Sequence, residues 1–265
     1  AAAVASAMKR LRPDKLVFTY QGDGDLAAIG TGETMHACNR GENITIIFVN
    51  NAIYGMTGGQ MAPTTLPGQK TQTTPQGRSV STEGYPLKVS ETVAALDAPV
   101  YVERVALSTV QNIRKARLAI RKALTNSIER KGFSLVECLS GCPVNLKMHA
   151  KEMNEFLDNQ MSRYFPLGVY KDIADSRDPL QRAEGIYDPR QVKELLYPVK
   201  VADGVSESFR NPSRIFEAER RIKLAGSGGQ GVLSLGYMLA TMGKLRNFNV
   251  SWLPSYGPEM RGGTA

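Results

Sequence analysis

The chain of 265 residues contains 42% hydrophobic and 22% charged residues, enough for one large or two smaller globular domains. Its longest apolar runs, such as ITIIFVN, are far shorter than the roughly 20 residues of a membrane span, so we expect no membrane insertion. The net charge is +8, but the basic residues are densest at 114–131, where Ile113, Ile120, Leu124 and Ile128 recur at helical spacing. This pattern favours a solvated or partner-facing amphipathic helix over a nucleic-acid site.

The three cysteines are too few for a disulfide framework, and no charged-then-apolar leader opens the chain. We therefore expect a reducing, cytoplasmic setting. Cys38 and Cys138 are interpreted as buried structural residues, because cysteine is among the most buried residue types. The chain opens without Met on an alanine-rich helical pattern and stops in a glycine turn, so we expect neighbouring sequence at both ends.

Strand-like runs alternate with helical or glycine-rich segments in the first half of the chain, at residues 16–20, 44–49, 99–105 and 133–139. The alternation predicts an α/β fold with a doubly wound, mostly parallel sheet. Residues 55–86 are rich in Gly, Thr, Gln and Pro and are long for a plain connection, which indicates a functional loop. A helical pattern over residues 149–165 precedes what reads as an irregular arm, residues 166–191.

A polar stretch after residue 202 predicts a domain boundary. We expect a first domain at residues 1–202, a linker at 203–220 and a second domain that begins at 221 and is truncated at 265. The second domain opens with a strand, a glycine turn and a helix, and its 45 residues are near the lower limit for an independent core.

The motif GDGDLAAIG, residues 22–30, follows the first predicted strand, and Asn50 and Asn51 end the second. If these strands are neighbours, their tips lie about 5 Å apart. One carboxylate, one amide and a backbone carbonyl suit a hard cation such as Mg²⁺, and the glycines allow a diphosphate to approach the backbone. Asp25 either joins this site or caps the helix expected to begin at Leu26.

The pair GDGD and NN, roughly 25 residues apart, is similar to the thiamine diphosphate fingerprint. The sequence from Tyr20 to Arg78 closely resembles the beta subunit of the 2-oxoacid:ferredoxin oxidoreductases. We extend this resemblance over about residues 1–200. The first domain is therefore expected to be an N-terminally truncated thiamine diphosphate-binding domain. The resemblance implies that Asp23, the Asn51 side chain and the Ile53 carbonyl hold Mg²⁺. It further implies that Gly22, Gly24 and the TGGQ of Thr57, Gly58, Gly59 and Gln60 lie around the diphosphate of the cofactor. Tyr54 is expected to be a further cofactor-binding residue, as is Asp25 if it joins the site.

Cys142 lies in ECLSGCPVN, after the fourth predicted strand. In the family that the chain resembles, a cysteine in a similar context is the fourth ligand of a 4Fe-4S cluster, and the other three ligands lie upstream of the thiamine motif. Such clusters take four thiolates, so the sequence as given does not complete one.

The second glycine turn, GSGGQG, satisfies G-x-G-x-x-G through Gly226, Gly228 and Gly231. A dinucleotide site predicts an acidic residue about 20 residues further on, but no Asp or Glu occurs before Glu259. Residues 221–265 instead resemble the start of the gamma subunit of the same oxidoreductases, which implies a second, Rossmann-like α/β domain. The turn then serves close packing or faces coenzyme A, and Arg261 either meets a phosphate or partner carboxylate or is solvated.

The resemblance implies coenzyme A-dependent oxidative decarboxylation of a 2-oxoacid to acyl-CoA and CO₂, with reduction of ferredoxin. The segment NNAIYGMTGGQMAPTTL most resembles members that act on 2-ketoisovalerate, and 2-oxoglutarate and pyruvate are the alternative substrates. We expect an alpha-subunit partner, which in the family supplies the activating glutamate, in a hetero-oligomer or a dimer of assemblies. Two alternatives remain open: a nicotinamide-binding dehydrogenase fragment that uses GSGGQG, and a non-catalytic assembly subunit of the same fold.

Overall fold

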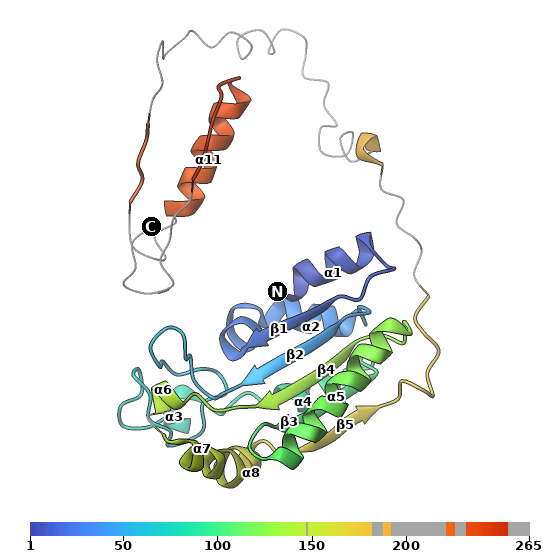
Figure 1. Ribbon diagram of the computed structural model, residues 1–265, viewed down its shortest axis with the longest axis vertical. Coiled ribbons are helices and arrows are strands. Elements are labelled where there is room, and N and C mark those ends of the chain that lie inside the picture. The colour runs from blue at the N-terminus through green and yellow to red at the C-terminus, as the bar shows by residue number, and fades with distance from the viewer. Residues whose placement is uncertain (147, 182–187, 192–220, 226–231, 254–265) are drawn as a thin grey trace. The chain divides into compact units, whose positions relative to one another are not determined.

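The computed structural model describes residues 1–146, 148–181, 188–191, 221–225 and 232–253 (Figure 1). The chain divides into two units, Ala1–Gly185 and Ile186–Ala265. The predicted linker at 203–220 and the glycine turn at 226–231 lie outside the described residues. In the second unit the described part contains α11 (Val232–Leu245), which corresponds to the helix expected after that turn. No helix within the described ranges is long and apolar enough to cross a membrane.

The first unit is built on a five-stranded sheet with strand order β1-β2-β4-β3-β5. Four parallel strands match the four predicted runs: β1 (Phe18–Gly22), β2 (Thr45–Asn50), β3 (Tyr101–Ala106) and β4 (Ser134–Leu139). The predicted α/β fold with a mostly parallel sheet is therefore confirmed. The three interior strands, β2, β4 and β3, are almost entirely buried, as expected for strands covered on both faces.

The fifth strand corrects the prediction of an irregular arm after residue 165. β5 (Gly168–Asp172) pairs antiparallel with β3 at the edge of the sheet. Its residues are exposed or half-buried, so the sequence there lacks the apolar run that marks the interior strands.

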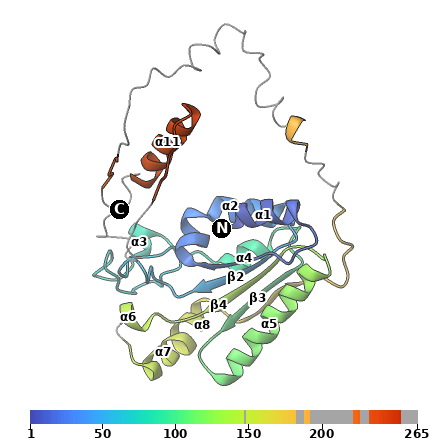
Figure 2. The same ribbon diagram turned by 45° about the horizontal axis from the view of Figure 1, so that its top comes forward.

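Helices cover both faces of the sheet (Figures 1 and 2). On one face lie α1 (Ala2–Leu11), the π-helical turn η1 (Asp25–Ile29), α2 (Thr31–Asn39) and α4 (Val89–Ala94). On the other lies α5 (Val110–Ile128), the predicted basic amphipathic helix. The buried stripe of α5 is formed by Ala116, Ala119 and Ala123, whereas Ile113 and Ile128, expected on its apolar face, are exposed. Alanines lack bulk, so this helix can approach the sheet closely.

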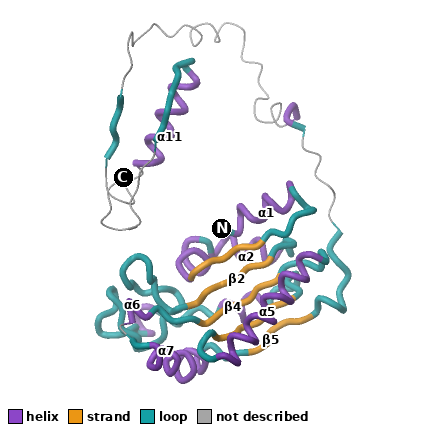
Figure 3. The backbone as a smooth tube through the Cα atoms, in the orientation of Figure 1, coloured by secondary structure: helices purple, strands orange, loops and turns teal. Residues whose placement is uncertain are grey.

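A third group of elements lies at the carboxyl edge of the parallel strands (Figure 3). It contains α3 (Val80–Glu83), α6 (Pro143–Leu146), α7 (Ala150–Phe156), a second π-helical turn η2 (Leu157–Met161) and α8 (Ser162–Tyr164). The last three form one helical segment, which confirms the helix predicted at 149–165. Its buried residues pack with Ala52, Ala106 and Leu139, and so anchor the edge where the polar motifs lie.

Candidate functional site

The GDGD and NN motifs meet at one edge of the sheet. β1 and β2 pair in parallel with Gly22 opposite Val49, so Asp23 and the Asn50–Asn51 pair follow neighbouring strand ends, as predicted. Asp23 Oδ2 accepts hydrogen bonds from the Ile53 backbone N–H at 3.2 Å and from Thr64 Oγ1 at 3.0 Å. The Ile53 N–H also donates to Asn51 Oδ1 at 3.2 Å. The structure therefore brings together the three residues predicted to hold Mg²⁺.

The Asp23 carboxylate is buried, with a residue exposure of 4%. Burial raises its pKa to about 6, although the hydrogen bonds from Thr64 and from backbone N–H groups act in the opposite direction. None of the ion pairs within the described ranges involves Asp23. A buried carboxylate with oxygen donors beside it and no cationic side chain fits a hard metal ion, which would compensate its charge.

The two asparagines of the NN motif have different surroundings. Asn50 is fully buried: its Nδ2 donates to Glu137 Oε1 at 2.8 Å, and its Oδ1 accepts from the Ala52 N–H at 3.1 Å. Asn51 is half-buried and lies beside Asp23 through their shared donor, Ile53. Only Asn51 is thus placed to join the candidate metal site.

The segment predicted to surround the diphosphate is shaped by glycines. A side chain at Gly24 would contact the ring of Tyr54 at 3.4 Å, whereas no atom lies within 4 Å of a Cβ built at Gly22. Gly58 and Gly59 have φ values of +105° and +90°, which favour glycine. Tyr54 and Gln60 form an antiparallel bridge that closes the turn between them.

Polar side chains fix the same turn from inside. Thr57 Oγ1 donates to Gln60 Oε1 at 2.5 Å, and Gln60 Nε2 donates to the Thr57 carbonyl at 2.7 Å and to Gln72 Oε1 at 3.1 Å. The turn predicted to surround the diphosphate is therefore held in place by hydrogen bonds from side chains of this chain.

Asp25 does not cap a helix, which corrects one of its two predicted roles. It is the first residue of η1, whose N-cap is Gly24, and no side-chain cap bond is present there. Its Oδ2 accepts from Gln21 Nε2 at 3.0 Å instead. Asp23 and Gly24 are already helical, so the helix begins before Leu26, the predicted first residue.

Cys142 lies beside the loop that carries the site. Asn145 Nδ2 donates to the Gly55 carbonyl at 2.7 Å and to Cys142 Sγ at 3.3 Å, and a Cβ at Gly55 would lie 3.0 Å from that sulfur. Within the described ranges no group of three or more His, Cys, Asp and Glu residues is placed to hold a metal ion. The described residues by themselves therefore do not fit a 4Fe-4S cluster, and the role of Cys142 as its fourth ligand stays a prediction.

Cys38 and Cys138 are buried in separate core clusters on the two faces of the sheet. Burial raises the pKa of each thiol to about 12, so both remain protonated at neutral pH. This agrees with the structural role expected from the sequence.

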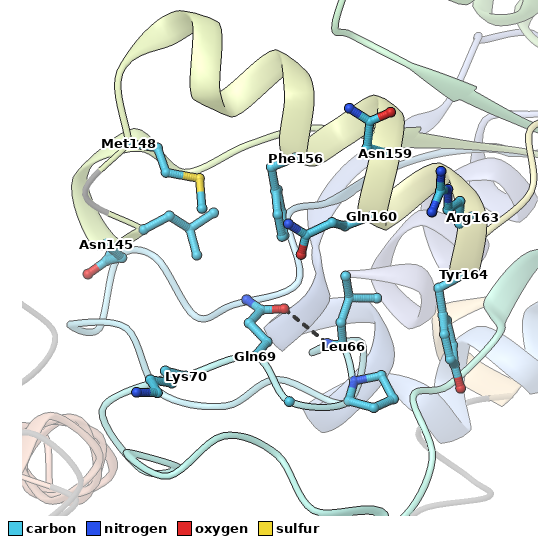
Figure 4. A pocket seen from close by; sticks show the side chains of 13 residues that line it. Leu66, Gln69, Lys70, Asn145, Met148, Phe156, Asn159, Gln160, Arg163 and Tyr164 are labelled. Atoms are coloured by element: carbon cyan, nitrogen blue, oxygen red, sulfur yellow. Dashed lines mark hydrogen bonds between the residues drawn. The ribbon is translucent and has the colours of Figure 1, made fainter.

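A pocket of about 920 Å³ lies between Leu66–Lys70, which is part of the 55–86 loop, and the helical segment that ends at Tyr164 (Figure 4). Gln69 donates from Nε2 to the Ala52 carbonyl at 3.0 Å, and Asn145, which contacts Cys142, also lines the pocket. Asp23 and Asn51 are not among its lining residues, so it is separate from the candidate metal site.

Comparison with protein families identifies the first unit. Residues 1–138 match the family described as thiamine pyrophosphate enzyme, C-terminal TPP binding domain. The chain belongs to this family of thiamine pyrophosphate enzymes. Residues 221–265 match a second family, described as pyruvate ferredoxin/flavodoxin oxidoreductase.

Individual relatives of this thiamine pyrophosphate enzyme chain agree with the sequence-based resemblance. It is 44% identical over 265 residues to the ketoisovalerate oxidoreductase subunit VorA of Methanothermobacter thermautotrophicus, an alignment that covers 100% of the chain and 54% of the relative. It is 36% identical over 163 residues to the 2-oxoglutarate synthase subunit KorB of Archaeoglobus fulgidus, covering 62% and 57%. The chain thus spans about half the length of these curated relatives, and the VorA alignment includes both units.

A solved structure shares the fold. The 2-oxoglutarate:ferredoxin oxidoreductase from Magnetococcus marinus, solved with 2-oxoglutarate, coenzyme A and succinyl-CoA bound, matches with a TM-score of 0.51 and 24% identity. The match covers 80% of this chain and 73% of that one. The α/β fold predicted for a thiamine diphosphate-binding domain is therefore shown.

Several residues around the site were not anticipated from the sequence. Thr64 donates to Asp23 from 41 positions away, and Glu137 accepts from Asn50 across 87 positions. The one available signal was the length of the 55–86 loop, which includes Thr64 and was predicted to be functional. Nothing in the local sequence of β4 marks Glu137.

Proposed function

We propose that this chain is the thiamine diphosphate- and Mg²⁺-binding part of a 2-oxoacid:ferredoxin oxidoreductase. The observation that carries the proposal is the meeting of Asp23, Asn51 and Ile53 at the shared end of β1 and β2. The family match and the similarity to VorA and KorB support it.

In this proposal Mg²⁺ is held by the Asp23 carboxylate, the Asn51 side-chain oxygen and the Ile53 carbonyl. The diphosphate lies against Gly22 and Gly24 and within the turn Thr57–Gln60, where glycines let it approach the backbone, and Asp25 and Tyr54 are proposed as further cofactor-binding residues. Thiamine diphosphate, when bound, supplies the electron sink for decarboxylation of a 2-oxoacid. The contribution of the chain is to bind and orient the cofactor and to exclude water from it.

We infer that the complete protein converts a 2-oxoacid, coenzyme A and oxidised ferredoxin to acyl-CoA, CO₂ and reduced ferredoxin. The similarity to VorA favours 2-ketoisovalerate as substrate, and the similarity to KorB keeps 2-oxoglutarate as the second candidate. An alpha subunit is the expected partner and source of the activating glutamate. Cys142 is proposed as the fourth ligand of a 4Fe-4S cluster, and a cytoplasmic setting fits three free thiols.

The test is calorimetric titration of thiamine diphosphate into the complete protein that contains this chain, with the subunits that co-purify. The titration is done with Mg²⁺, after Mg²⁺ removal, and with NADH in place of thiamine diphosphate. We expect Mg²⁺-dependent binding of thiamine diphosphate and no signal from NADH. Binding of NADH alone would overturn the proposal and favour the second glycine turn as the functional site.

A further inference from the structure

A buried glutamate on the central strand β4 lies behind the candidate metal site. Glu137 has no exposed surface, and its two carboxylate oxygens have different partners. Oε2 accepts from Arg104 Nε at 2.9 Å and from Ser90 Oγ at 2.5 Å. Oε1 accepts from Asn50 Nδ2 at 2.8 Å. The Oε2 atom thus belongs to an ion pair in the core, whereas Oε1 faces the end of β2.

The carboxylate fixes which way the Asn50 amide points. A carboxylate that is paired with Arg104 accepts hydrogen bonds and donates none, so only the NH₂ group of Asn50 can face it. The amide oxygen of Asn50 is thereby directed at the backbone N–H of Ala52, from which it accepts a hydrogen bond at 3.1 Å. Reversal of the amide would set its oxygen against Glu137 Oε1, acceptor against acceptor, and its NH₂ group against the Ala52 N–H, donor against donor.

Ala52 needs this support because of its backbone conformation. It is fully buried and has a φ of +57°, in the left-handed region that is unfavourable for residues other than glycine. Its carbonyl accepts from Thr65 Oγ1 at 2.7 Å and from Gln69 Nε2 at 3.0 Å, while its N–H relies on Asn50. The next residue, Ile53, donates its N–H to Asp23 and Asn51.

We infer that Glu137 is a positioning residue for the Mg²⁺–diphosphate site, acting through the Asn50 amide on the Ala52–Ile53 turn. The inference rests on the proposed function. It divides the NN motif into two parts: Asn50, oriented by Glu137, shapes the turn, and Asn51 serves as the ligand. The competing interpretation is that Glu137 serves only the buried ion pair with Arg104, in which case the Asn50 contact is incidental.

The first variant is Glu137→Gln, which keeps the shape of the side chain. The two donors on the Oε2 side require the oxygen of the new amide, so its NH₂ group faces Asn50 and forces that amide to reverse. The Ala52 N–H then loses its acceptor. We expect the Kd of thiamine diphosphate at saturating Mg²⁺ to rise about tenfold or more.

Ser90→Ala is the matched control, because it removes a hydrogen bond to Oε2 of the same carboxylate and leaves Oε1 and Asn50 in contact. We expect it to lower the melting temperature and to change the Kd by no more than about twofold. A rise in Kd equal to that of Glu137→Gln would show that any damage to the ion-pair cluster disturbs the site, and would overturn the inference.

The decisive variant is the double substitution Glu137→Gln with Asn50→Asp. The new carboxylate at position 50 accepts from the new amide with one oxygen and from the Ala52 N–H with the other, so the hydrogen bond is restored with reversed polarity. We expect the Kd to return to within about threefold of the wild type. A role in the ion pair alone predicts no recovery.

Calorimetry on the complete protein with its co-purifying subunits distinguishes failure of the proposed function from failure of the inference about Glu137. If the wild type itself shows no Mg²⁺-dependent binding of thiamine diphosphate, the proposed function fails and the inference fails with it. If the wild type binds and Glu137→Gln binds equally well, or the double variant stays as weak as the single one, only the inference is overturned.

Discussion

The sheet and the loop at its carboxyl edge are held together in different ways. The interior of the sheet is mainly apolar: Ile46, Phe48, Leu135 and Val136 are fully buried between helices, and the buried ion pair of Glu137 with Arg104 is an exception. The loop at 51–86 buries mainly polar side chains, namely Gln60, Thr64, Thr65, Thr71, Thr74 and Arg78, each joined to backbone or side-chain partners. Apolar packing is non-directional and tolerant of small shifts, whereas hydrogen bonds specify positions.

Cofactor binding and global stability should therefore depend on different parts of the first unit. Substitutions of apolar residues in the sheet should change the free energy of unfolding and leave the affinity of the folded protein for its cofactor unchanged. Substitutions of the polar residues that form or support the loop should change the cofactor affinity or the local stability of the loop, with little effect on the unfolding of the sheet.

The largest expected effect is that of Asp23→Ala. It removes the buried carboxylate from the proposed metal site. Loss of a residue that only supports a metal ligand costs about 10–100-fold in affinity, so loss of the ligand itself should weaken Mg²⁺-dependent binding of thiamine diphosphate by at least about 100-fold. Because burial of the charge is itself unfavourable, the melting temperature measured without Mg²⁺ and thiamine diphosphate should not fall. Calorimetry and thermal melts measure both quantities, with Asp14→Ala, an exposed carboxylate paired with Arg12, as control. Unchanged affinity would contradict the metal assignment.

Leu135→Ala tests the other side of the comparison. Leu135 is fully buried in the core on the α1–α2 face of the sheet, and its truncation should lower the free energy of unfolding by about 2–5 kcal/mol. Urea denaturation followed by circular dichroism measures the loss. The folded variant should bind thiamine diphosphate with the wild-type Kd, and a weaker Kd would show that the two regions are coupled.

Arg78→Lys tests what holds the loop. Arg78 is buried and donates to the carbonyls of Pro63, Thr65 and Gly84 at 3.0, 2.6 and 2.9 Å, as well as to those of Ala62, Glu83 and Tyr85. A lysine ammonium has three donors at one point and cannot reach this spread of acceptors. We expect the loop to lose about 1–3 kcal/mol of local stability.

Limited proteolysis provides the measurement for Arg78→Lys. Cleavage within residues 55–86 should accelerate, while urea unfolding of the sheet changes little, because local opening need not involve the core. Equal cleavage rates in variant and wild type would mean that the loop is held by its threonine and glutamine contacts instead.

The same contrast explains what the sequence predicted and what it did not. The four parallel strands coincide with the mostly apolar runs at 16–20, 44–49, 99–105 and 133–139, and the pairing of the first two brings GDGD and NN together without further information. The different surroundings of Asn50 and Asn51 could not be predicted, because Asn50 contacts Glu137, which is 87 positions away and shows no local pattern. β5 was missed because an edge strand that is largely exposed has no apolar run to mark it. Directional contacts between distant residues therefore set the limit of sequence-based prediction here.

The smallest expected effect concerns the ion pair that connects the sheet to α4. Burial raises the pKa of Glu91, but the hydrogen bonds and charge of Arg104 outweigh it, so the pKa lies below its usual range. A carboxyl group whose pKa is lower in the folded state stabilises the protein fully above its unfolded pKa of about 4.3, and this contribution is lost as the pH falls through the folded pKa. Glu91→Gln should therefore cost up to about 1 kcal/mol at pH 7, and the difference from the wild type should vanish at acid pH. Urea denaturation of both proteins between pH 7 and pH 3 measures this. A constant difference would mean that Glu91 stabilises the fold by packing, because packing does not depend on its charge.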